Sequence, residues 1–389
     1  MIHLALRFIE VVAVLGAFSA CAFYLVCVAG ALGFLRSVKN EADVAARPAP
    51  PVSILKPLKG TDPGMYENLR SHCLQEYPEF EILFGVSDAN DPALKYARQL
   101  QAEFPAIAIR VVVCQRALGT NVKVSNLAQM LQEARYEHVV VNDSDIRVGR
   151  DYLNRVVPPL NDPRIGLVTC LYRGVPSPSL GSRFESLFIS TDFCAGVVAA
   201  QLVEGGIHFG LGSTLAFRRA DLAAAGGFEA LADYLADDYE LGRRIAGLGL
   251  RVKLSETVVE TYLPRYDFST FFIHQIRWAR TIRDSRPGGY LGLVATFGIP
   301  WALIALLCAG GAAWSWALLA AAAILRFLAA AIVGRVVLRD RQVLRSFALI
   351  PLRDVVGVLV WLVGFRGNAI EWRGDSFALK DGKLVRTGS

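Results

Sequence analysis

Two long apolar segments, one near each end, constrain the fold of this 389-residue chain more than any other feature of its sequence. The first covers residues 4–35 and exceeds the roughly 20 apolar residues that a helix needs to cross a bilayer. The second covers residues 290–365. Residues 48–285 between them have ordinary globular composition and are numerous enough to bury one sizeable core. We therefore predict a globular domain flanked by membrane segments.

The basic residues around the first segment predict which side of the membrane the globular domain occupies. Arg36, Lys39 and Arg47 follow the segment. At the other end of the segment there is only Arg7, and a proline-rich linker at 47–51 leads into the domain. Positive residues that flank a span tend to stay in the cytoplasm. The domain is therefore expected on the cytoplasmic side.

The net charge of +6 raises the question of nucleic acid as a partner. Proteins that bind single-stranded nucleic acid interleave aromatic and basic residues. In this chain many arginines instead flank the apolar segments, so the membrane explains the charge better. We expect a lipid bilayer, and no nucleic acid, among its partners.

The C-terminal apolar block divides into two predicted spans, 290–310 and 313–334, and a third segment, 346–365. The loop after the second span is basic and so is expected in the cytoplasm, which makes the two spans a hairpin. Its basic residues are Arg335, Arg339, Arg341 and Arg345. The third segment carries Arg353 and Asp354, and a charge at mid-depth costs about 2.5–3.5 kcal/mol. A re-entrant or interfacial segment is therefore favoured, with a third full span as the alternative.

These features divide the chain into three predicted regions. Residues 1–47 form a transmembrane anchor and linker, 48–287 the cytoplasmic domain, and 288–389 a membrane domain and tail. The middle region alternates apolar runs with amphipathic stretches, which is typical of a doubly wound α/β sheet. The predicted strands are 52–55, 82–86, 109–113, 139–141 and 166–171, and predicted helices include 93–103 and 125–134.

Asp143 and Asp145 follow directly after one of these strands. Ligands of such sheets bind beyond the carboxyl ends of strands. Carboxylates are hard oxygen ligands that suit Mg²⁺ or Mn²⁺. A metal held in this way commonly neutralises a diphosphate, so we predict a metal site here, with an ordinary surface turn as the alternative.

Asp88 also follows a strand, where a carboxylate can accept hydrogen bonds from a base or a ribose. The alternative is a helix cap before Pro92, but Asp91 fills that role better. Asp237 and Asp238 open another predicted helix. Carboxylates at that position often only cap the helix, yet one of the pair is a candidate general base.

A helical stretch at 268–283 is rich in aromatic and basic residues and includes His274, Arg277 and Trp278. A helix of this composition suits a membrane surface. We expect Arg277 to pair with a departing diphosphate and Trp278 to line an acceptor site. The alternative is that the helix is only an interfacial anchor.

Taken in order, these motifs resemble the processive-type membrane glycosyltransferases of the GT-A (Rossmann-like) fold, and among them the ceramide glucosyltransferases. That family has two spaced aspartates, a third in a (D/E)-D-Y context and a (Q/R)-x-x-R-W motif. Asp88, Asp143, Asp238 and Arg277-Trp278 match in order. Local strings also match, at Ser53–Gly60, Asn121–Leu127, Asp143–Val148 and Pro351–Asp354.

The resemblance implies a role for each site residue. Asp88 would contact the uridine, while Asp143 and Asp145 would hold Mg²⁺ or Mn²⁺ and the diphosphate. Asp238 would act as the catalytic base. The remaining candidates are Arg277 and Trp278, which would close over donor and acceptor, and Lys123, which would lie near the nucleotide unless it is an ordinary lysine at a helix N-terminus.

His274 departs from the family pattern, which has Gln or Arg at this position. When protonated, His274 can still donate to a phosphate oxygen. The departure weakens the expected phosphate contact at this position and leaves the one at Arg277 intact.

The resemblance further implies transfer of one sugar from a UDP-sugar to a lipid hydroxyl with inversion. Ceramide with glucose, and a hopanoid such as bacteriohopanetetrol with N-acetylglucosamine, remain open as acceptor and sugar. The Ala- and Arg-rich composition suggests a bacterial chain, and hence the inner membrane. A polysaccharide synthase and a non-catalytic membrane scaffold are the further alternatives.

Overall fold

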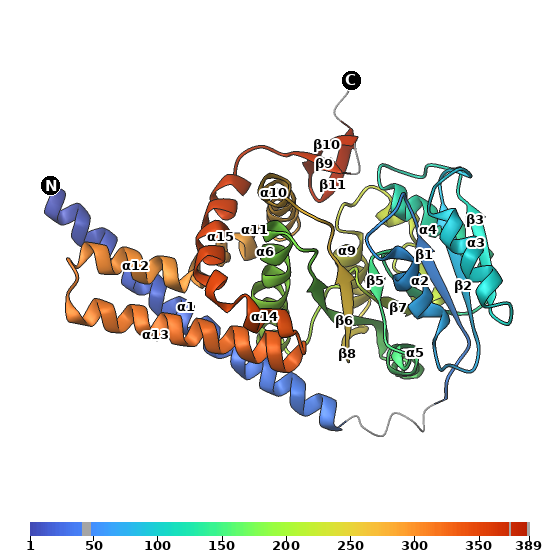
Figure 1. Cartoon of the computed structure of the whole chain (residues 1–389), viewed down its shortest axis with the longest axis horizontal. Helices are drawn as coiled ribbons and strands as arrows, with labels where there is room; N and C mark the ends of the chain where they lie inside the picture. The colour runs from blue at the N-terminus through green and yellow to red at the C-terminus, as the bar shows by residue number, and fades with distance from the viewer. Residues whose placement is uncertain (41–47, 373–374, 387–389) are drawn as a thin grey trace. The chain divides into compact units, whose positions relative to one another are not determined.

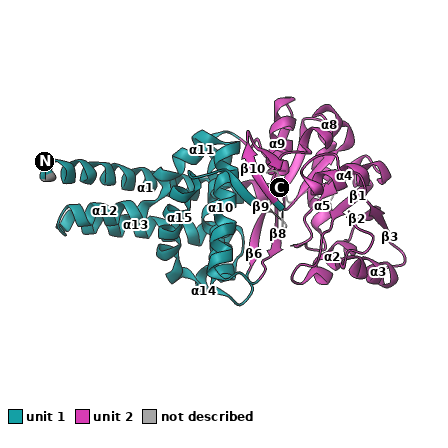
Figure 2. Ribbon diagram, turned by 90° about the horizontal axis from the view of Figure 1, so that it is seen from above, with its two compact units in different colours: residues 1–35, 176–205, 265–375 teal, residues 36–175, 206–264, 376–389 magenta. Residues whose placement is uncertain are grey.

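The computed structural model describes residues 1–40, 48–372 and 375–386, so Arg47 at the start of the predicted linker lies outside the described residues. The chain forms two compact units, shown in different colours in Figure 2. The helical unit comprises residues 1–35, 176–205 and 265–375. The sheet unit comprises residues 36–175, 206–264 and 376–389. Each unit is built from segments that are distant in the sequence.

Eight strands form one sheet within the described part of the sheet unit, in the order β3-β2-β1-β4-β7-β6-β8-β5. The first four in that order are parallel, whereas β7 is antiparallel to both β4 and β6. All five predicted strands are present, and the α/β fold class is confirmed. The strands are β1 Val52–Pro57, β2 Phe80–Val86, β3 Ala108–Val113, β4 His138–Val141, β5 Ile146–Arg147, β6 Ile165–Val175, β7 Leu215–Arg218 and β8 Arg251–Tyr262.

Helices pack against this sheet and bring their N-terminal turns to the ends of its strands. Helix α4 packs on β1 and β2, and α3 packs on β3 (Figure 1). Asn121 caps α4 by accepting a hydrogen bond from the amide of Val124 at 3.2 Å. The helical segments are α2 Met65–Cys73, α3 Leu94–Glu103, α4 Val122–Glu133, α5 Tyr152–Val156, η2 Pro158–Asn161, α8 Arg219–Ala224, η4 Glu229–Leu231 and α9 Asp237–Gly247. The sheet unit also includes a hairpin of β10 Asp375–Lys380 and β11 Lys383–Arg386.

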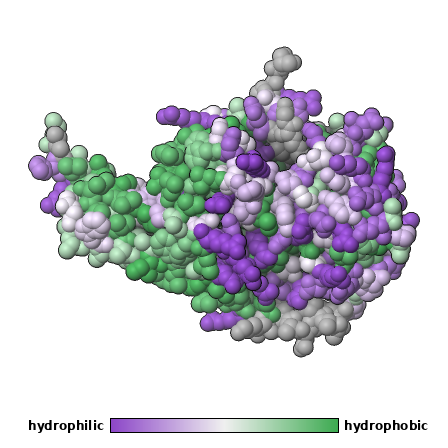
Figure 3. Space-filling model, in the orientation of Figure 1, coloured by the Kyte–Doolittle hydropathy of each residue, from purple (hydrophilic) through white to green (hydrophobic). Residues whose placement is uncertain are grey.

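The helical unit is almost entirely α-helical. Its apolar surface gathers over α12, α13 and α15, as Figure 3 shows. Its elements are α1 Ile2–Asn40, α6 Leu180–Phe188, η3 Ile189–Phe193, α7 Cys194–Val203, α10 Phe268–Ser285, α11 Pro287–Gly292, η5 Leu293–Thr296, α12 Gly298–Cys308, α13 Ala313–Ala330, η6 Ala331–Val337, α14 Arg341–Arg345, η7 Phe347–Leu349, α15 Ile350–Gly364 and β9 Ala369–Trp372.

Four helices within the described residues are long and apolar enough to cross a membrane: His3–Val38, Leu180–Val203, Ala313–Val337 and Phe347–Gly364. A fifth candidate, Pro287–Thr296 with Gly298–Cys308, is bent by 53°. It overlaps the first predicted C-terminal span, 290–310, which is therefore broken. The N-terminal helix agrees with the expected anchor.

The helix Leu180–Val203 was not expected, because it falls inside the region predicted to be globular. Glu185 and Asp192 interrupt its apolar sequence and hide the pattern. Residues 176–205 and 265–287 belong to the helical unit, so the structural division differs from the predicted boundary at 287. The two acidic residues have partners on other helices of this unit, since Glu185 accepts a hydrogen bond from Gln275 and Asp192 pairs with Arg326.

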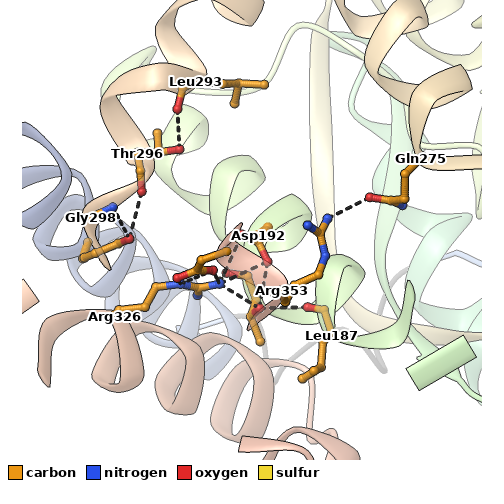
Figure 4. Close-up of polar contacts among 11 residues, drawn as sticks. Leu187, Asp192, Gln275, Leu293, Thr296, Gly298, Arg326 and Arg353 are labelled. Atoms are coloured by element: carbon orange, nitrogen blue, oxygen red, sulfur yellow. Dashed lines mark hydrogen bonds and ion pairs between the residues drawn. The ribbon is translucent and has the colours of Figure 1, made fainter. Parts of the chain in front are cut away.

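Arg353 and Asp354 show how charges are accommodated in the third C-terminal segment. Their exposed fractions are only 3% and 5%, and both face the interior of the helical unit. Asp354 accepts a 2.8 Å hydrogen bond from Arg326, and Arg353 donates one of 2.7 Å to Gln275 (Figure 4). Because the two charges have partners inside the helical unit, they do not by themselves favour a re-entrant segment over a full span at 346–365. A full span at Phe347–Gly364 meets the length and apolarity requirement.

Candidate functional site

The turn after β4 carries the first pair of candidate carboxylates, Asp143 and Asp145. The ammonium group of Lys123, in the first turn of α4, lies 2.9 Å from a carboxylate oxygen of Asp143. The same ammonium lies 3.2 Å from Asp237 at the start of α9. Lys123 therefore joins the turn after β4 to the acidic start of α9, and the sheet unit brings together residues that are almost 100 positions apart in the sequence.

The side chains of Asp143 and Asp238 both lie next to Gly212. A Cβ atom added to Gly212 would lie 3.1 Å from Asp238 Oδ2 and 3.3 Å from Asp143 Oδ2. Any side chain at this position would therefore crowd both carboxylates. Gly212 was not among the predicted site residues, because only the folded structure places it between two aspartates.

Burial and mutual repulsion shift the ionisation of the carboxylates. Burial and the neighbouring Asp143 raise the pKa of Asp145 to about 6, although the Thr261 hydroxyl, which donates to Asp145 at 2.6 Å, opposes the shift. Burial and Asp237 raise the pKa of Asp238 to about 6. A carboxylate with such a pKa binds a proton readily near neutral pH, as a general base must.

The charge on Lys123 is secured by the same carboxylates. Burial alone would lower the pKa of its ammonium group, but Asp143 and Asp237 outweigh burial and raise the pKa. Lys123 therefore stays positively charged and offsets part of the negative charge at this site. The location of Lys123 near the nucleotide stays a prediction.

Lys56 lies beneath the turn and was missed by sequence reasoning. Its side chain is fully buried, and its ammonium group donates to the backbone carbonyl of Asp143 at 2.7 Å. His72 Nε2 lies 3.4 Å from the same ammonium and 3.2 Å from Asn142 Oδ1. Burial lowers the pKa of Lys56 to about 7, against the opposing effect of Asp145 and Asp143. A lysine directly after a predicted buried strand was the available signal.

The carboxylates of Asp143 and Asp145 suit a divalent cation whose remaining ligands come from a second molecule. Among the described residues, no group of three or more His, Cys, Asp or Glu side chains is arranged to hold a metal ion alone. Mg²⁺ is commonly held by one or two carboxylates together with substrate phosphates. Asp143 and Asp145 supply such a partial set, and the Asp143 side chain is 39% exposed and so accessible to an incoming ligand.

Asp88 follows β2 and is exposed. Its carboxylate accepts a 2.8 Å hydrogen bond from the Asn90 amide. Asp91 accepts from the Ala93 amide at 2.9 Å and from the Gly60 amide at 3.1 Å, and the N-cap residue of α3, Ala93, has no side-chain cap hydrogen bond. The Asp88 side chain therefore does not cap the helix that follows Pro92, and its contact with a nucleotide stays a prediction.

The last three predicted residues lie on α10 in the helical unit. His274 stacks on Tyr266, with ring centroids 5.4 Å apart, and its Nδ1 atom lies 3.4 Å from Glu185. Trp278 meets the rings of Phe188 and Phe193 edge-on at 5.8 and 5.5 Å. The residue at the unusual first position of the motif thus contacts a buried carboxylate from α6, which the sequence did not predict.

The family model and the relatives that this chain matches are all glycosyltransferases. The family model described as "Glycosyl transferase family 21" matches residues 12–385. Ceramide glucosyltransferase 1 of Caenorhabditis elegans is 27% identical over 207 residues, which cover 53% of this chain and 44% of the relative. Ceramide glucosyltransferase of Komagataella phaffii is 34% identical over 137 residues, covering 33% and 27%. The chain thus spans about half the length, or less, of these relatives.

A solved structure shares the fold. Mannosyltransferase PcManGT from Pyrobaculum calidifontis, in complex with GDP-Man and Mn²⁺, superimposes with a TM-score of 0.51 at 21% sequence identity. The match covers 92% of this chain and 99% of that one. Together with the mixed sheet, it confirms the GT-A-like fold predicted from the motifs.

Proposed function

Because the chain belongs to glycosyl transferase family 21, we propose that it transfers a single sugar from a UDP-sugar to a hydroxyl group of a membrane lipid. The observation that carries this proposal is the meeting of Asp143 and Asp238 over Gly212. The relatives named as ceramide glucosyltransferases support ceramide as the acceptor and glucose as the sugar.

Asp238 is the base in the proposed reaction. Its carboxylate takes the proton of the acceptor hydroxyl while that oxygen forms a bond to the anomeric carbon of the sugar. The bond between the anomeric carbon and the diphosphate oxygen breaks, and the electron pair leaves with UDP. A single displacement of this kind inverts the configuration at the anomeric carbon. The raised pKa of Asp238, about 6, suits its role because the group is mostly ionised at pH 7 and still basic.

Asp143 and Asp145 would hold the divalent cation of the reaction. Bound Mg²⁺ or Mn²⁺ supplies positive charge that stabilises the departing diphosphate. The chain's own contribution is to fix the two carboxylates. Lys56 binds the Asp143 carbonyl from below, and Lys123 adds a permanent positive charge beside the Asp143 carboxylate.

The sequence motifs support roles for four further residues. We place Asp88 against the uridine, because it follows a strand end and is not used as a cap. Arg277 would pair with the leaving diphosphate, His274 would donate to a phosphate oxygen when protonated, and Trp278 would contact the acceptor. The support for these three is their order in the motif.

The membrane location of the acceptor follows from the helical unit. Its candidate spans would keep the protein in the bilayer, so a lipid acceptor need not leave the membrane. Arg36 and Lys39, at the C-terminal end of α1, support a cytoplasmic site, where UDP-sugars are available. For a bacterial chain this membrane would be the inner membrane.

The test uses the purified protein in mixed micelles with Mn²⁺ or Mg²⁺. UDP-glucose and UDP-N-acetylglucosamine are each incubated with ceramide or bacteriohopanetetrol, and lipid products are identified by mass. A hexosyl-ceramide is expected, and the Asp238→Asn variant serves as the inactive control. An N-acetylhexosaminyl hopanoid as product would support the hopanoid alternative and contradict ceramide as the acceptor. Polymer instead of a single-sugar lipid, or no product from any pair, would contradict the proposal.

A further inference from the structure

The C-terminal end of the chain folds back as part of the sheet unit. Strands β10 and β11 form a hairpin whose turn, Asp381-Gly382, has φ angles of 52° and 77°. Such Asp-Gly turns match the twist of two-residue hairpins. Phe377, Leu379 and Leu384 are at most 3% exposed, so the hairpin is packed in place. Figure 2 shows β10 in the colour of the sheet unit, like α9.

The hairpin pairs with the segment that leads into α9. The Leu384 amide donates to the carbonyl of Asp233 at 2.7 Å, and the Leu235 amide donates to the carbonyl of Gly382 at 3.2 Å. Tyr234 and Lys383 form an antiparallel bridge between these two bonds. Residues 233–235 are therefore held like a short additional strand along the edge of β11.

The same segment is tied on its other side to the start of α4. Thr120 donates from its amide to Asp233 Oδ1 at 2.9 Å, and its hydroxyl lies 3.0 Å from that oxygen and 3.1 Å from the Leu384 carbonyl. Asn121 donates to the Tyr234 carbonyl at 2.7 Å. One hydroxyl thus joins the turn before α4, the segment before α9 and the C-terminal hairpin.

Two residues of the proposed site, Asp238 and Lys123, lie close in sequence to this junction. Asp237 and Asp238 follow Leu235 after a single residue, and Lys123 follows Thr120 after two. Lys123 contacts Asp237 at 3.2 Å, so a shift of either segment would change the surroundings of Asp238. Displacements of about 1 Å at a distant position can lower a rate about 100-fold.

We propose that the C-terminal hairpin, residues 376–386, positions Asp238 and Lys123 for catalysis by clamping residues 233–235. The hairpin contributes positioning groups, and none of its residues takes part in the chemistry. This inference rests on the proposed function for its kinetic readout. It assigns a role to the end of the chain, which sequence reasoning treated only as a basic tail.

The first test removes residues 376–389 from the chain. The kcat is expected to fall by about 10- to 100-fold, because Asp238 loses its fixed position. The KM for the UDP-sugar is expected to stay within about threefold, since the hairpin leaves the Asp88 side of the sheet untouched. An unchanged kcat would overturn the proposal.

A pair of point variants keeps the test decisive if the shortened chain folds poorly. Thr120→Val removes the bridging hydroxyl, and Thr120→Ser retains it. We expect Thr120→Val to lower kcat at least fivefold and Thr120→Ser to restore it to near the original value, on the order of a lost and a regained hydrogen bond. Equal activity of the two variants would overturn the proposal.

Hydrogen exchange separates this inference from the proposed function. In the unaltered chain the Leu235 amide should be protected, and removal of 376–389 should accelerate its exchange together with that of the amides at 236–239. If the unaltered chain makes no glycolipid but the exchange result is obtained, the proposed function fails and the clamp stands. If glycolipid forms and the exchange at 235–239 does not change, the clamp fails alone.

Discussion

At the scale of single residues, the sequence identified the acidic groups and missed what surrounds them. Asp143 and Asp145 were predicted as metal ligands because they follow a buried strand, where ligands of α/β sheets bind, and this role stays a prediction. The roles of Lys56 and Gly212 were not predicted. Lys56 contacts a carbonyl 87 positions away in the sequence, and Gly212 matters because it lies beside two carboxylates. Residue type and local spacing predict chemistry, but contacts across the sheet have no local signature.

Asp238→Asn tests the proposed base. The amide retains the shape of the side chain but accepts no proton, so kcat should fall about 100- to 10,000-fold. Binding of the UDP-sugar, followed by calorimetry, should remain. Activity near that of the unaltered chain would show that Asp238 is not the base.

The pH dependence of kcat gives a second test at the same residue. The pKa of Asp238 is raised to about 6, and the base acts only when deprotonated. Activity should therefore be full above this pH and fall as pH decreases through about 6. UDP binding measured over the same range is the control for the acidic groups at the metal turn. A rate that stays constant down to pH 5, about one unit below that value, would contradict the assignment.

Lys56→Met tests whether the buried lysine organises the metal turn. Its loss leaves the Asp143 carbonyl without its donor, at a cost of about 1–3 kcal/mol. Metal-dependent UDP binding should weaken by about tenfold, because a more mobile Asp143 is a poorer ligand. Lys95→Met, at an exposed lysine on α3, is the matched control. Equal UDP affinity in the two variants would remove Lys56 from the site.

At the scale of elements, strands were predicted better than membrane helices. Buried parallel strands read as continuous apolar runs, so all five expected strands were found. The helix Leu180–Val203 escaped notice because Glu185 and Asp192 interrupt it. The burial of these acidic residues depends on partners from α10, α13 and α15, which are distant in the sequence.

Arg326 on α13 tests how these charges hold the helical unit together. Its guanidinium contacts Asp354 at 2.8 Å and Asp192 at 3.2 Å (Figure 4). Arg326→Met leaves two carboxylates without their cation, and breaking such a buried pair costs about 3–5 kcal/mol. The melting temperature in detergent should therefore drop strongly, whereas Arg341→Met at an exposed position should not change it. Equal melting temperatures of the two variants would contradict a stabilising role for the network.

At the scale of the whole molecule, the sequence predicted membrane segments at both ends but not how the chain is divided. Hydropathy locates α1 and the C-terminal helices because their apolar runs are long. It does not show that residues 176–205 and 265–287 join them, since that grouping depends on which faces the helices bury. The N-terminal helix is correspondingly more than an anchor. Tyr24 on α1 accepts a hydrogen bond from the Gly298 amide at 3.0 Å and donates one to the Thr296 carbonyl at 2.8 Å.

Two glycines of α1 test whether that helix is an integral part of the helical unit. A Cβ atom at Gly30 would lie 2.3 Å from the Val198 carbonyl oxygen, whereas one at Gly33 would meet nothing within 4 Å. Alanine favours a helix over glycine by about 1 kcal/mol, so Gly33→Ala should leave the melting temperature unchanged or raise it. Gly30→Ala should lower it, because α1 and α7 must move apart to admit the methyl group. Thermal unfolding in detergent compares the two, and equal behaviour would mean that α1 serves as an anchor without packing on α7.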